Sequence, residues 1–425
     1  MVYRNYFATD KSKERFTLGY HFTYNPDTRH FSQHRYSEDA EATDSYQNTD
    51  GGMREHSALL SYLWQVHPKQ AIRVSLKEMY RLGDTRSVYL LDEEQRSSMD
   101  YHNNIAEGNV TYSTSIGHAM IEGGVRLNHD YFRMGLPLTP ENDFSNKHLY
   151  VMPSASIYWM LNSKHALYFN YATSLTRPTV QMLNPFVNVA NDASRSQGNP
   201  DLKAQYTHDL SLYWIFNGVH NLSVFSGLSY LNVQDMIHNY NYLNGNNKVV
   251  STYGNMGVGN QIGLILNTKW NATKWLMLSV NGNAGIRYLS ADGIGLNQKD
   301  WYYNLSPECN LLLPKHYRLG INGGFYNGLP NPWTDKNTLI MYSFNASKSF
   351  LKGRLNVSMM VNSPFSKYHK SIENTSQPTL RIKQTNFITA RSFGIRLSYS
   401  FGSGQKVDIE RDRIMQSTDQ VTGVN

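Results

Sequence analysis

Few residues of this chain could carry out chemistry, and they are scattered. Asp92, Glu93 and Glu94 form an acidic group whose carboxylates could hold a cation. No further ligands follow them at a regular spacing, so we interpret the group as part of a solvated loop. The 15 histidines likewise show no paired spacing of the kind that metal sites use. We therefore predict no metal site.

His129 is a candidate base, because it has Asp130 beside it and lies between Leu127 and Tyr131 in an alternating stretch. A hydrolase would need a serine close to this histidine on the same face. None stands at the neighbouring positions of the same parity, so we place His129 at a lipid interface. Cys309 is alone, which excludes a disulfide framework and a cysteine-rich zinc site. We predict no catalytic residue, no cofactor and no enzymatic activity.

The composition argues against an ordinary soluble chain. Of the 425 residues only 17% are charged, against about 25% in typical soluble domains. Aromatic residues reach 13%, too many for a disordered chain. The longest uncharged stretch, Leu210 to Gln234, is interrupted by asparagine and glycine, so it cannot form a lipid-buried helix. The net charge of +7 comes without a dense basic patch, and we expect no nucleic-acid partner.

The dominant period of the chain is two. In the stretch Leu276 to Tyr288 one parity is apolar and the other is small and polar. The same alternation recurs at Phe16–Tyr24, Trp301–Leu313 and Phe393–Phe401. These stretches are about 9 to 13 residues long, which suits a tilted strand that crosses a membrane. The pattern predicts an all-β, antiparallel transmembrane β-barrel in the outer membrane, in contact with its lipid.

Short turns on one side and long polar loops on the other are typical of such a barrel, with the short side periplasmic. Long connections run over residues 135–146, 176–202 and 366–379. Aromatic side chains beside the short turns predict an interfacial girdle: Trp159, Trp214, Phe216, Trp270, Trp275, Tyr317 and Phe401. The predicted short turns are Asn25–Thr28, His67–Gln70, Ser115–His118, Asn162–His165, Asn217–His220, Asn271–Lys274, Leu313–His316 and Phe350–Gly353.

Eight short turns and a last strand at Gln384–Phe401 predict 17 strands in residues 1–402, followed by a polar periplasmic tail at 403–425. Bacterial barrels of one chain have even strand numbers. If the first strand runs into the turn at Asn25–Thr28, at least one strand must precede it. Residues Met1–Asp10 also lack the apolar core of a signal peptide. We therefore expect the chain to be the C-terminal part of a longer protein. Whether Met1 is the true start stays open.

One long connection carries a motif in three pieces: Arg177-Pro178, then Leu183-Asn184-Pro185-Phe186, then Gly198-Asn199-Pro200, Leu202 and Lys203. This motif resembles the signature of TonB-dependent outer-membrane receptors, in particular the outer-membrane β-barrel family of Bacteroidota. Ala204 and Gln205 stand where that signature usually has Pro-Glu. From the residues alone, two interpretations remain open: the prolines and glycine shape the loop, or the loop touches a substrate.

The resemblance implies a barrel of 22 strands around an N-terminal plug, so that this chain is an incomplete barrel without its plug. It also implies import of a bulky nutrient such as a siderophore, cobalamin, a glycan or a peptide. The TonB complex would act through the missing plug, and a surface lipoprotein is a further possible partner. Arg126, Arg287 and Arg396, on the polar parity, would then either bind plug carboxylates or line a pore. The alternatives are a passive structural or pore-forming barrel and, less favoured, a barrel enzyme.

Overall fold

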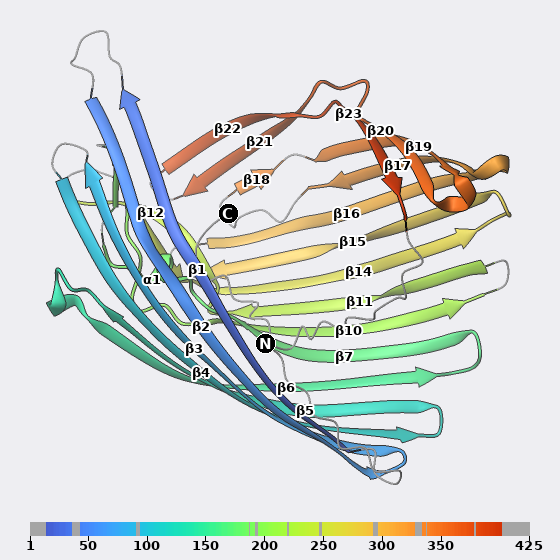
Figure 1. The fold of residues 1–425 in the computed structure, drawn as a ribbon, viewed down its shortest axis with the longest axis horizontal. Coiled ribbons are helices and arrows are strands. Elements are labelled where there is room, and N and C mark those ends of the chain that lie inside the picture. The colour runs from blue at the N-terminus through green and yellow to red at the C-terminus, as the bar shows by residue number, and fades with distance from the viewer. Residues whose placement is uncertain are drawn as a thin grey trace.

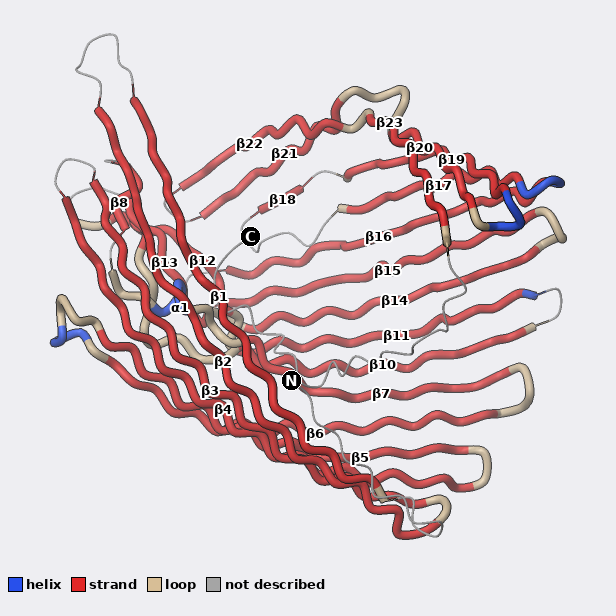
Figure 2. The backbone as a smooth tube through the Cα atoms, viewed as in Figure 1, coloured by secondary structure: helices blue, strands red, loops and turns tan. Residues whose placement is uncertain are grey.

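The computed structural model describes residues 14–35, 43–90, 94–186, 188–191, 194–218, 221–245, 249–291, 296–327, 334–336, 338–377 and 380–401. Nearly all of these residues lie in β-strands (Figure 2). Among them no helix has the length and apolar character needed to span a bilayer.

One antiparallel sheet of sixteen strands dominates the described residues (Figure 1). Its strands pair in the order β1, β2, β3, β4, β5, β6, β7, β10, β11, β14, β15, β16, β17, β19, β20, β23. The bounds are β1 Arg15–Arg35, β2 Thr43–His67, β3 Gln70–Leu90, β4 Glu94–Ile116, β5 Ala119–Gly135, β6 Phe144–Met160, β7 His165–Thr176, β10 Gln205–Asn217, β11 Leu222–Gln234, β14 Val258–Asn271, β15 Leu276–Ala291, β16 Leu296–Leu313, β17 Tyr317–Tyr326, β19 Leu339–Phe350, β20 Leu355–Asn362 and β23 Ser392–Tyr399.

The predicted all-β antiparallel class is confirmed, and seven of the eight predicted short turns fall between neighbouring strands of this sheet. Of these seven, Asn217–His220 is described only as far as Gly218. The prediction at Asn25–Thr28 is wrong, because β1 runs straight through it and Asn25 pairs with Met53 of β2. Pro26 is compatible with a strand here because β1 is an edge strand, where proline removes no ladder hydrogen bond on its open side. The described sheet therefore has sixteen strands and not 17. β1 starts at the short-turn side and runs away from it. The argument that an odd number of strands requires a further strand before the first one therefore no longer holds.

The C-terminal region also differs from the prediction. The expected loop at 366–379 contains β21 (Tyr368–Gln377), which pairs with β22 (Leu380–Thr389) and with β18 (Thr334–Lys336) in a separate three-stranded sheet. The expected strand Gln384–Phe401 is divided between β22 and the shorter β23. The chain passes from one sheet to the other at Ala390. Clear alternation holds at Phe393–Phe401 but does not reach back to Gln384, so the period did not support one continuous strand there.

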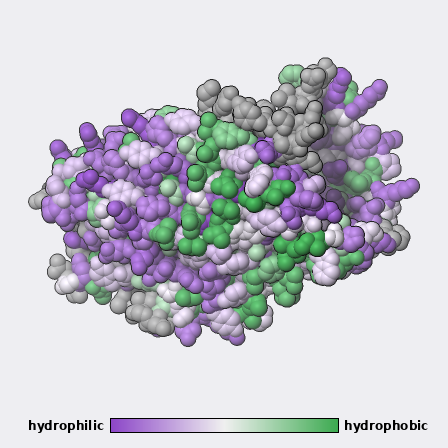
Figure 3. Space-filling view, turned by 90° about the horizontal axis from the view of Figure 1, so that it is seen from below, coloured by the Kyte–Doolittle hydropathy of each residue, from purple (hydrophilic) through white to green (hydrophobic). Residues whose placement is uncertain are grey.

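The two faces of the large sheet differ as the alternation predicts. Leu18, Tyr20 and Phe22 of β1 point outward and are 46–47% exposed, whereas Ser57 of β2 on the opposite face is fully buried. Figure 3 shows hydrophobic side chains gathered across the middle of one outer face, with hydrophilic side chains toward both ends. A strand needs about 9–11 residues to cross a bilayer. β2 has 25, so β1–β4 continue beyond the apolar band on the long-loop side (Figure 1).

The sheet curves strongly, but within the described residues β1 and β23 stay unpaired as its two edges (Figure 1). An unpaired backbone edge is costly in hydrocarbon, where no water can satisfy the N–H and C=O groups.

The assignment of faces can be tested with Val125→Arg. Val125 lies between Val110 and Pro153 on the outward face and is 45% exposed. Arginine there faces lipid, so we expect the free energy of unfolding in phospholipid vesicles to fall by about 2–4 kcal/mol. The control is Ser154→Arg, one ladder position away on the inner face and exposed, with little expected change. Equal costs for the two variants would contradict the assignment.

Candidate ligand-binding lumen

The connection between β7 and β10, residues 177–204, folds back into the concave side of the sheet, and we call it the motif loop (Figures 1 and 2). It contains α1 (Val180–Leu183), β8 (Asn188–Asn191) and β9 (Ser194–Ser196). β12 (Ile237–Leu243) and β13 (Val249–Asn255) join β9 and β8 in a second, four-stranded sheet.

The motif loop is closed by its own backbone. Gly198 N–H donates to the Asn184 carbonyl at 2.9 Å, and Asn199 N–H donates to the Met182 carbonyl at 2.6 Å. A Cβ on Gly198 would lie 2.4 Å from the Asn184 carbonyl oxygen, so only glycine fits this approach. The Asn199 side-chain amide donates to the Tyr253 carbonyl of β13 at 3.0 Å, which ties the loop to the second sheet.

Two leucines of the motif pack the loop against the inner face of the barrel wall. Leu183 and Leu202 are only 5% and 2% exposed. They share one apolar cluster with Met53, Met99, Tyr101, Phe132, Met134 and Leu136, which lie on β2, β4, β5 and just after β5. The motif loop is therefore held by an apolar contact against the inner face of β2, β4 and β5.

Arg177 connects the start of the motif loop to β5 by a bidentate ion pair. Its Nε lies 2.6 Å from Asp130 Oδ2 and its Nη2 lies 3.0 Å from Asp130 Oδ1, while the Asn128 side-chain oxygen accepts a third bond at 2.9 Å. The side chains of Arg177 and Asp130 are 15% and 11% exposed. We call this group the latch. In a partly dry site such paired, charge-assisted bonds hold a loop firmly.

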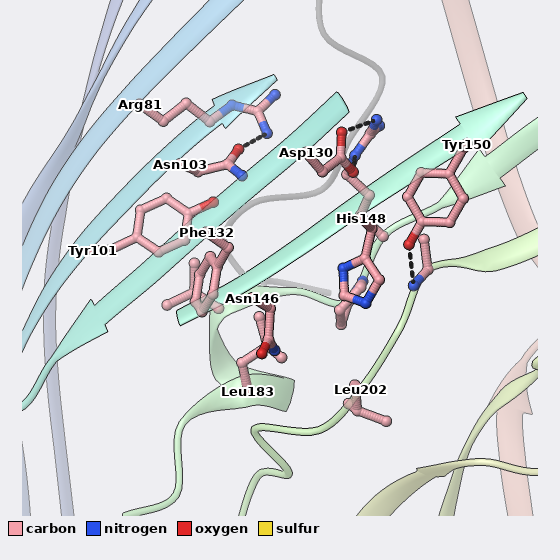
Figure 4. A pocket seen from close by; sticks show the side chains of 14 residues that line it. Arg81, Tyr101, Asn103, Asp130, Phe132, Asn146, His148, Tyr150, Leu183 and Leu202 are labelled. Atoms are coloured by element: carbon pink, nitrogen blue, oxygen red, sulfur yellow. Dashed lines mark hydrogen bonds and ion pairs between the residues drawn. The ribbon is translucent and has the colours of Figure 1, made fainter. Parts of the chain in front are cut away.

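The polar wall continues from the latch toward the other side of β4. Arg81 of β3 pairs with Glu55 of β2 at 2.7 Å, and its guanidinium contacts the Asn103 side-chain oxygen of β4 at 3.4 Å (Figure 4). A cavity of about 60 Å³, large enough for a few water molecules, lies among Arg81, Asp130, His148 and Tyr150 (Figure 4). The Tyr150 hydroxyl accepts from Ala204 N–H at 3.2 Å at the far end of the motif loop.

A larger cavity, of about 190 Å³, lies between the motif loop and the inner faces of β1–β4. Val180, Asn184, Phe186 and Gly198 line it from the loop side. The motif loop thus closes one side of a hollow in the lumen.

The structure brings most of the predicted motif residues together. The Pro185 carbonyl accepts from the Gln197 amide at 3.0 Å, the Pro200 carbonyl accepts from the Asn146 amide at 2.8 Å, and Lys203 N–H donates to the Asn255 side chain at 2.8 Å. Pro178 lines the smaller cavity and Phe186 the larger one. These contacts account for the loop's shape, and contact with a substrate stays a prediction.

Sequence reasoning missed the partners of the latch. Asp130 was considered only as the neighbour of His129, and Asn128 was not considered. The alternation along β5 could have identified them. Asn128 and Asp130 flank the outward His129, so they face inward on the same side as Arg126.

The residues of the predicted girdle lie at the short-turn end of the sheet. Trp159, Trp214, Trp270, Trp275 and Tyr317 are 40–52% exposed there, Phe401 is 86% exposed, and Phe216 is half-buried beside Trp214. Their role as a membrane interface stays a prediction.

The remaining candidates lie apart from the motif loop. Asp92, Glu93 and the tail at 403–425 lie outside the described residues, and Glu94 pairs with Arg96 at 2.7 Å. His129 faces outward between Ala106 and Leu149. Within the described part of the chain no group of three His, Cys, Asp or Glu side chains could hold a metal ion.

Two of the three inward arginines pair with acids of the wall. Arg126 lies 3.8 Å from Glu107, and Arg287 lies 3.6 Å from Asp300, whereas Arg396 is exposed on the edge strand β23. The wall itself therefore supplies counter-charges for Arg126 and Arg287.

The alternating faces, the long antiparallel strands and the inward-folded loop define a membrane β-barrel of the outer-membrane type. A family model described as the outer membrane protein beta-barrel family matches residues 7–399. The chain belongs to this family and is an outer-membrane protein.

Three solved structures with a similar fold have titles that describe them as an uptake receptor or a transporter. The ferric yersiniabactin uptake receptor FyuA from Yersinia pestis is 13% identical, with 93% of this chain and 63% of that chain covered and a TM-score of 0.59. The ferric citrate transporter FecA is 10% identical, with 91% of this chain and 59% of that chain covered and a TM-score of 0.65. The copper transporter OprC is 13% identical, with 92% of this chain and 66% of that chain covered and a TM-score of 0.59. At these identities the likeness establishes the fold alone, and the chain spans 59–66% of the length of these three structures. No curated protein matches the sequence.

The latch can be tested by a double-mutant cycle of Arg177→Leu and Asp130→Leu. Each single variant leaves a charge in the wall without its main partner, so we expect each to lower the free energy of unfolding by about 3–5 kcal/mol. The double variant should lower the free energy of unfolding by much less than the sum of the two single variants. Arg126→Leu is the control, because its partner is distant and its side chain is 41% exposed. Strict additivity of the two latch substitutions would argue against the pair.

The closure of the motif loop can be tested with Gly198→Ala. The added methyl group would collide with the Asn184 and Met182 backbone, so we expect the loop to open and limited proteolysis within residues 177–204 to become faster by about tenfold or more. Gly245→Ala is the matched control, since no atom lies within 4 Å of its Cβ position. Unchanged cleavage in the Gly198 variant would mean that the loop is held by other contacts.

Proposed function

We propose that this chain forms most of the wall of a TonB-dependent outer-membrane receptor that imports a nutrient. The observation that carries the proposal is the motif loop. It is folded into the concave side of the sheet, latched to β5 by Arg177 and packed by Leu183 and Leu202, so that it occupies part of the space inside the wall. A lumen partly occupied in this way suits a gated importer better than a passive diffusion pore.

The resemblance to the receptor signature and the fold shared with proteins titled as uptake receptors and transporters support the same proposal. In it, a plug and additional strands of the same receptor occupy the lumen and the open side between β1 and β23. TonB acts through that plug. The barrel wall performs no bond chemistry and provides a rigid support against which the plug moves.

A passive pore is the second candidate, and the wet inner wall near the short turns favours it. Gln65, Ser113, Glu122 and Ser156 line a hollow of about 320 Å³ at that end. A pore would conduct ions without an energy source, which separates the two candidates.

The proposal predicts energy-dependent uptake. Cells lacking this gene should stop depleting at least one medium component, followed by mass spectrometry, and cells lacking TonB should stop depleting the same component. Deleting both genes should add nothing. We expect the 425-residue chain expressed alone to support no such uptake, because the proposed plug is absent from it. Uptake that continues without TonB, or ohmic conductance steps of the chain in planar bilayers, would favour the pore.

A further inference from the structure

The larger cavity lies between the motif loop and the inner wall, and a wall position that lines it has no side chain. Gly83 of β3 lies on its inner lining. A Cβ at Gly83 would meet the Gly52 carbonyl oxygen at 3.5 Å and the Tyr101 ring at 3.6 Å, which is ordinary van der Waals contact. The backbone there would accept a larger residue without a steric clash. The glycine therefore leaves room in the lumen that a side chain would otherwise fill.

The lining of this cavity combines polar and apolar groups and carries no net charge. Asp27 and Arg29 of β1 are the charged side chains in it, and they neutralise each other in a two-bond pair at 2.6 and 2.8 Å. The remaining polar groups are amides and hydroxyls from both sides, including Gln47 and Thr85 of the wall and Gln181 of the loop. Such groups both donate and accept hydrogen bonds, so they match a ligand that does the same.

Aromatic side chains complete the lining. Tyr101, Phe186 and Tyr253 contribute from the wall, the motif loop and the second sheet. An apolar ring beside several neutral polar groups suits the mixed surface of a pyranose, which has C–H faces and a rim of hydroxyls. A volume of about 190 Å³ has room for about one such ring.

We propose that this cavity binds one neutral sugar unit of the imported ligand, with Gln47, Thr85 and Gln181 hydrogen-bonding to its hydroxyl groups. The inference rests on the proposed importer and names its substrate class. A strongly anionic or cationic ligand would find no uncompensated counter-charge in the cavity, because the charge of Asp27 is already paired with that of Arg29. Desolvating a free charge there would be unfavourable.

The test is saturation-transfer-difference NMR on the full chain in detergent. The probes are D-glucose, D-galactose, D-mannose, D-xylose and N-acetyl-D-glucosamine, with D-glucuronate and D-glucosamine as charged analogues. We expect at least one neutral sugar to bind, and its charged analogue to bind about tenfold more weakly or not at all.

Gly83→Leu should abolish the signal by filling the hollow. Gly108→Leu is the matched control, because its Cβ would meet only Leu76 at 3.7 Å on the outward face. Thr85→Val and Gln181→Leu remove polar groups without filling the cavity and should each weaken binding by about tenfold. Cooperative unfolding and heat-modifiable gel mobility show whether each variant is folded.

The inference is overturned if no neutral sugar binds, if the signal survives Gly83→Leu in a folded protein, or if the charged analogues bind as well as the neutral sugars. Its failure is separable from that of the proposed importer. Uptake that depends on TonB without sugar binding would refute the substrate class alone. Sugar binding with uptake independent of TonB would refute the importer alone.

Discussion

The structure depends on one constraint, which is that a polypeptide in hydrocarbon must pair its own backbone donors and acceptors. A strand can do so only with neighbours on both sides, so the chain forms a long series of paired antiparallel strands. Along each strand the side chains alternate between the two faces of the sheet. This alternation puts Leu18, Tyr20 and Phe22 toward lipid and the alternate residues toward the lumen. At the edge strands β1 and β23 one side of the backbone has no pairing strand among the described residues, so the constraint is not met there.

On the concave side of the sheet, apolar packing and an ion pair hold the motif loop in place. The buried apolar cluster that includes Leu183, Leu202 and Phe132 lies on the concave side of the wall and fixes the motif loop there. The ion pairs Arg177–Asp130 and Arg81–Glu55 are spread over β2, β3 and β5 beside this cluster. A buried charge without its partner is costly, so the pair Arg177–Asp130 specifies one position for the loop rather than simply adding stability. The pair Arg81–Glu55 joins β3 to β2 within the wall. The loop is therefore held against the wall on this side of the barrel.

Alternation and turn chemistry were enough to predict the fold class and seven of the turns, because both act over a few neighbouring residues. The failures come from distant partners. Asn25–Thr28 has the composition of a turn, but twenty-one ladder positions with β2 override it. The hairpin β21–β22 and the contact of Arg177 with Asp130, 47 residues away in sequence, depend on which segments meet in space. The motif residues were found from their resemblance to a family, whereas the amides and hydroxyls of the larger cavity carry no signal along the chain.

The hollow beside Gly83 also has a genetic consequence. A glycine codon becomes an alanine, valine or serine codon through one base change, and the backbone at Gly83 has space for a Cβ. Point mutations could therefore reduce or reshape this chamber while the ladder of β2, β3 and β4 stays intact. Under the proposed sugar binding, such substitutions would change which sugars the cavity accepts at little cost to folding.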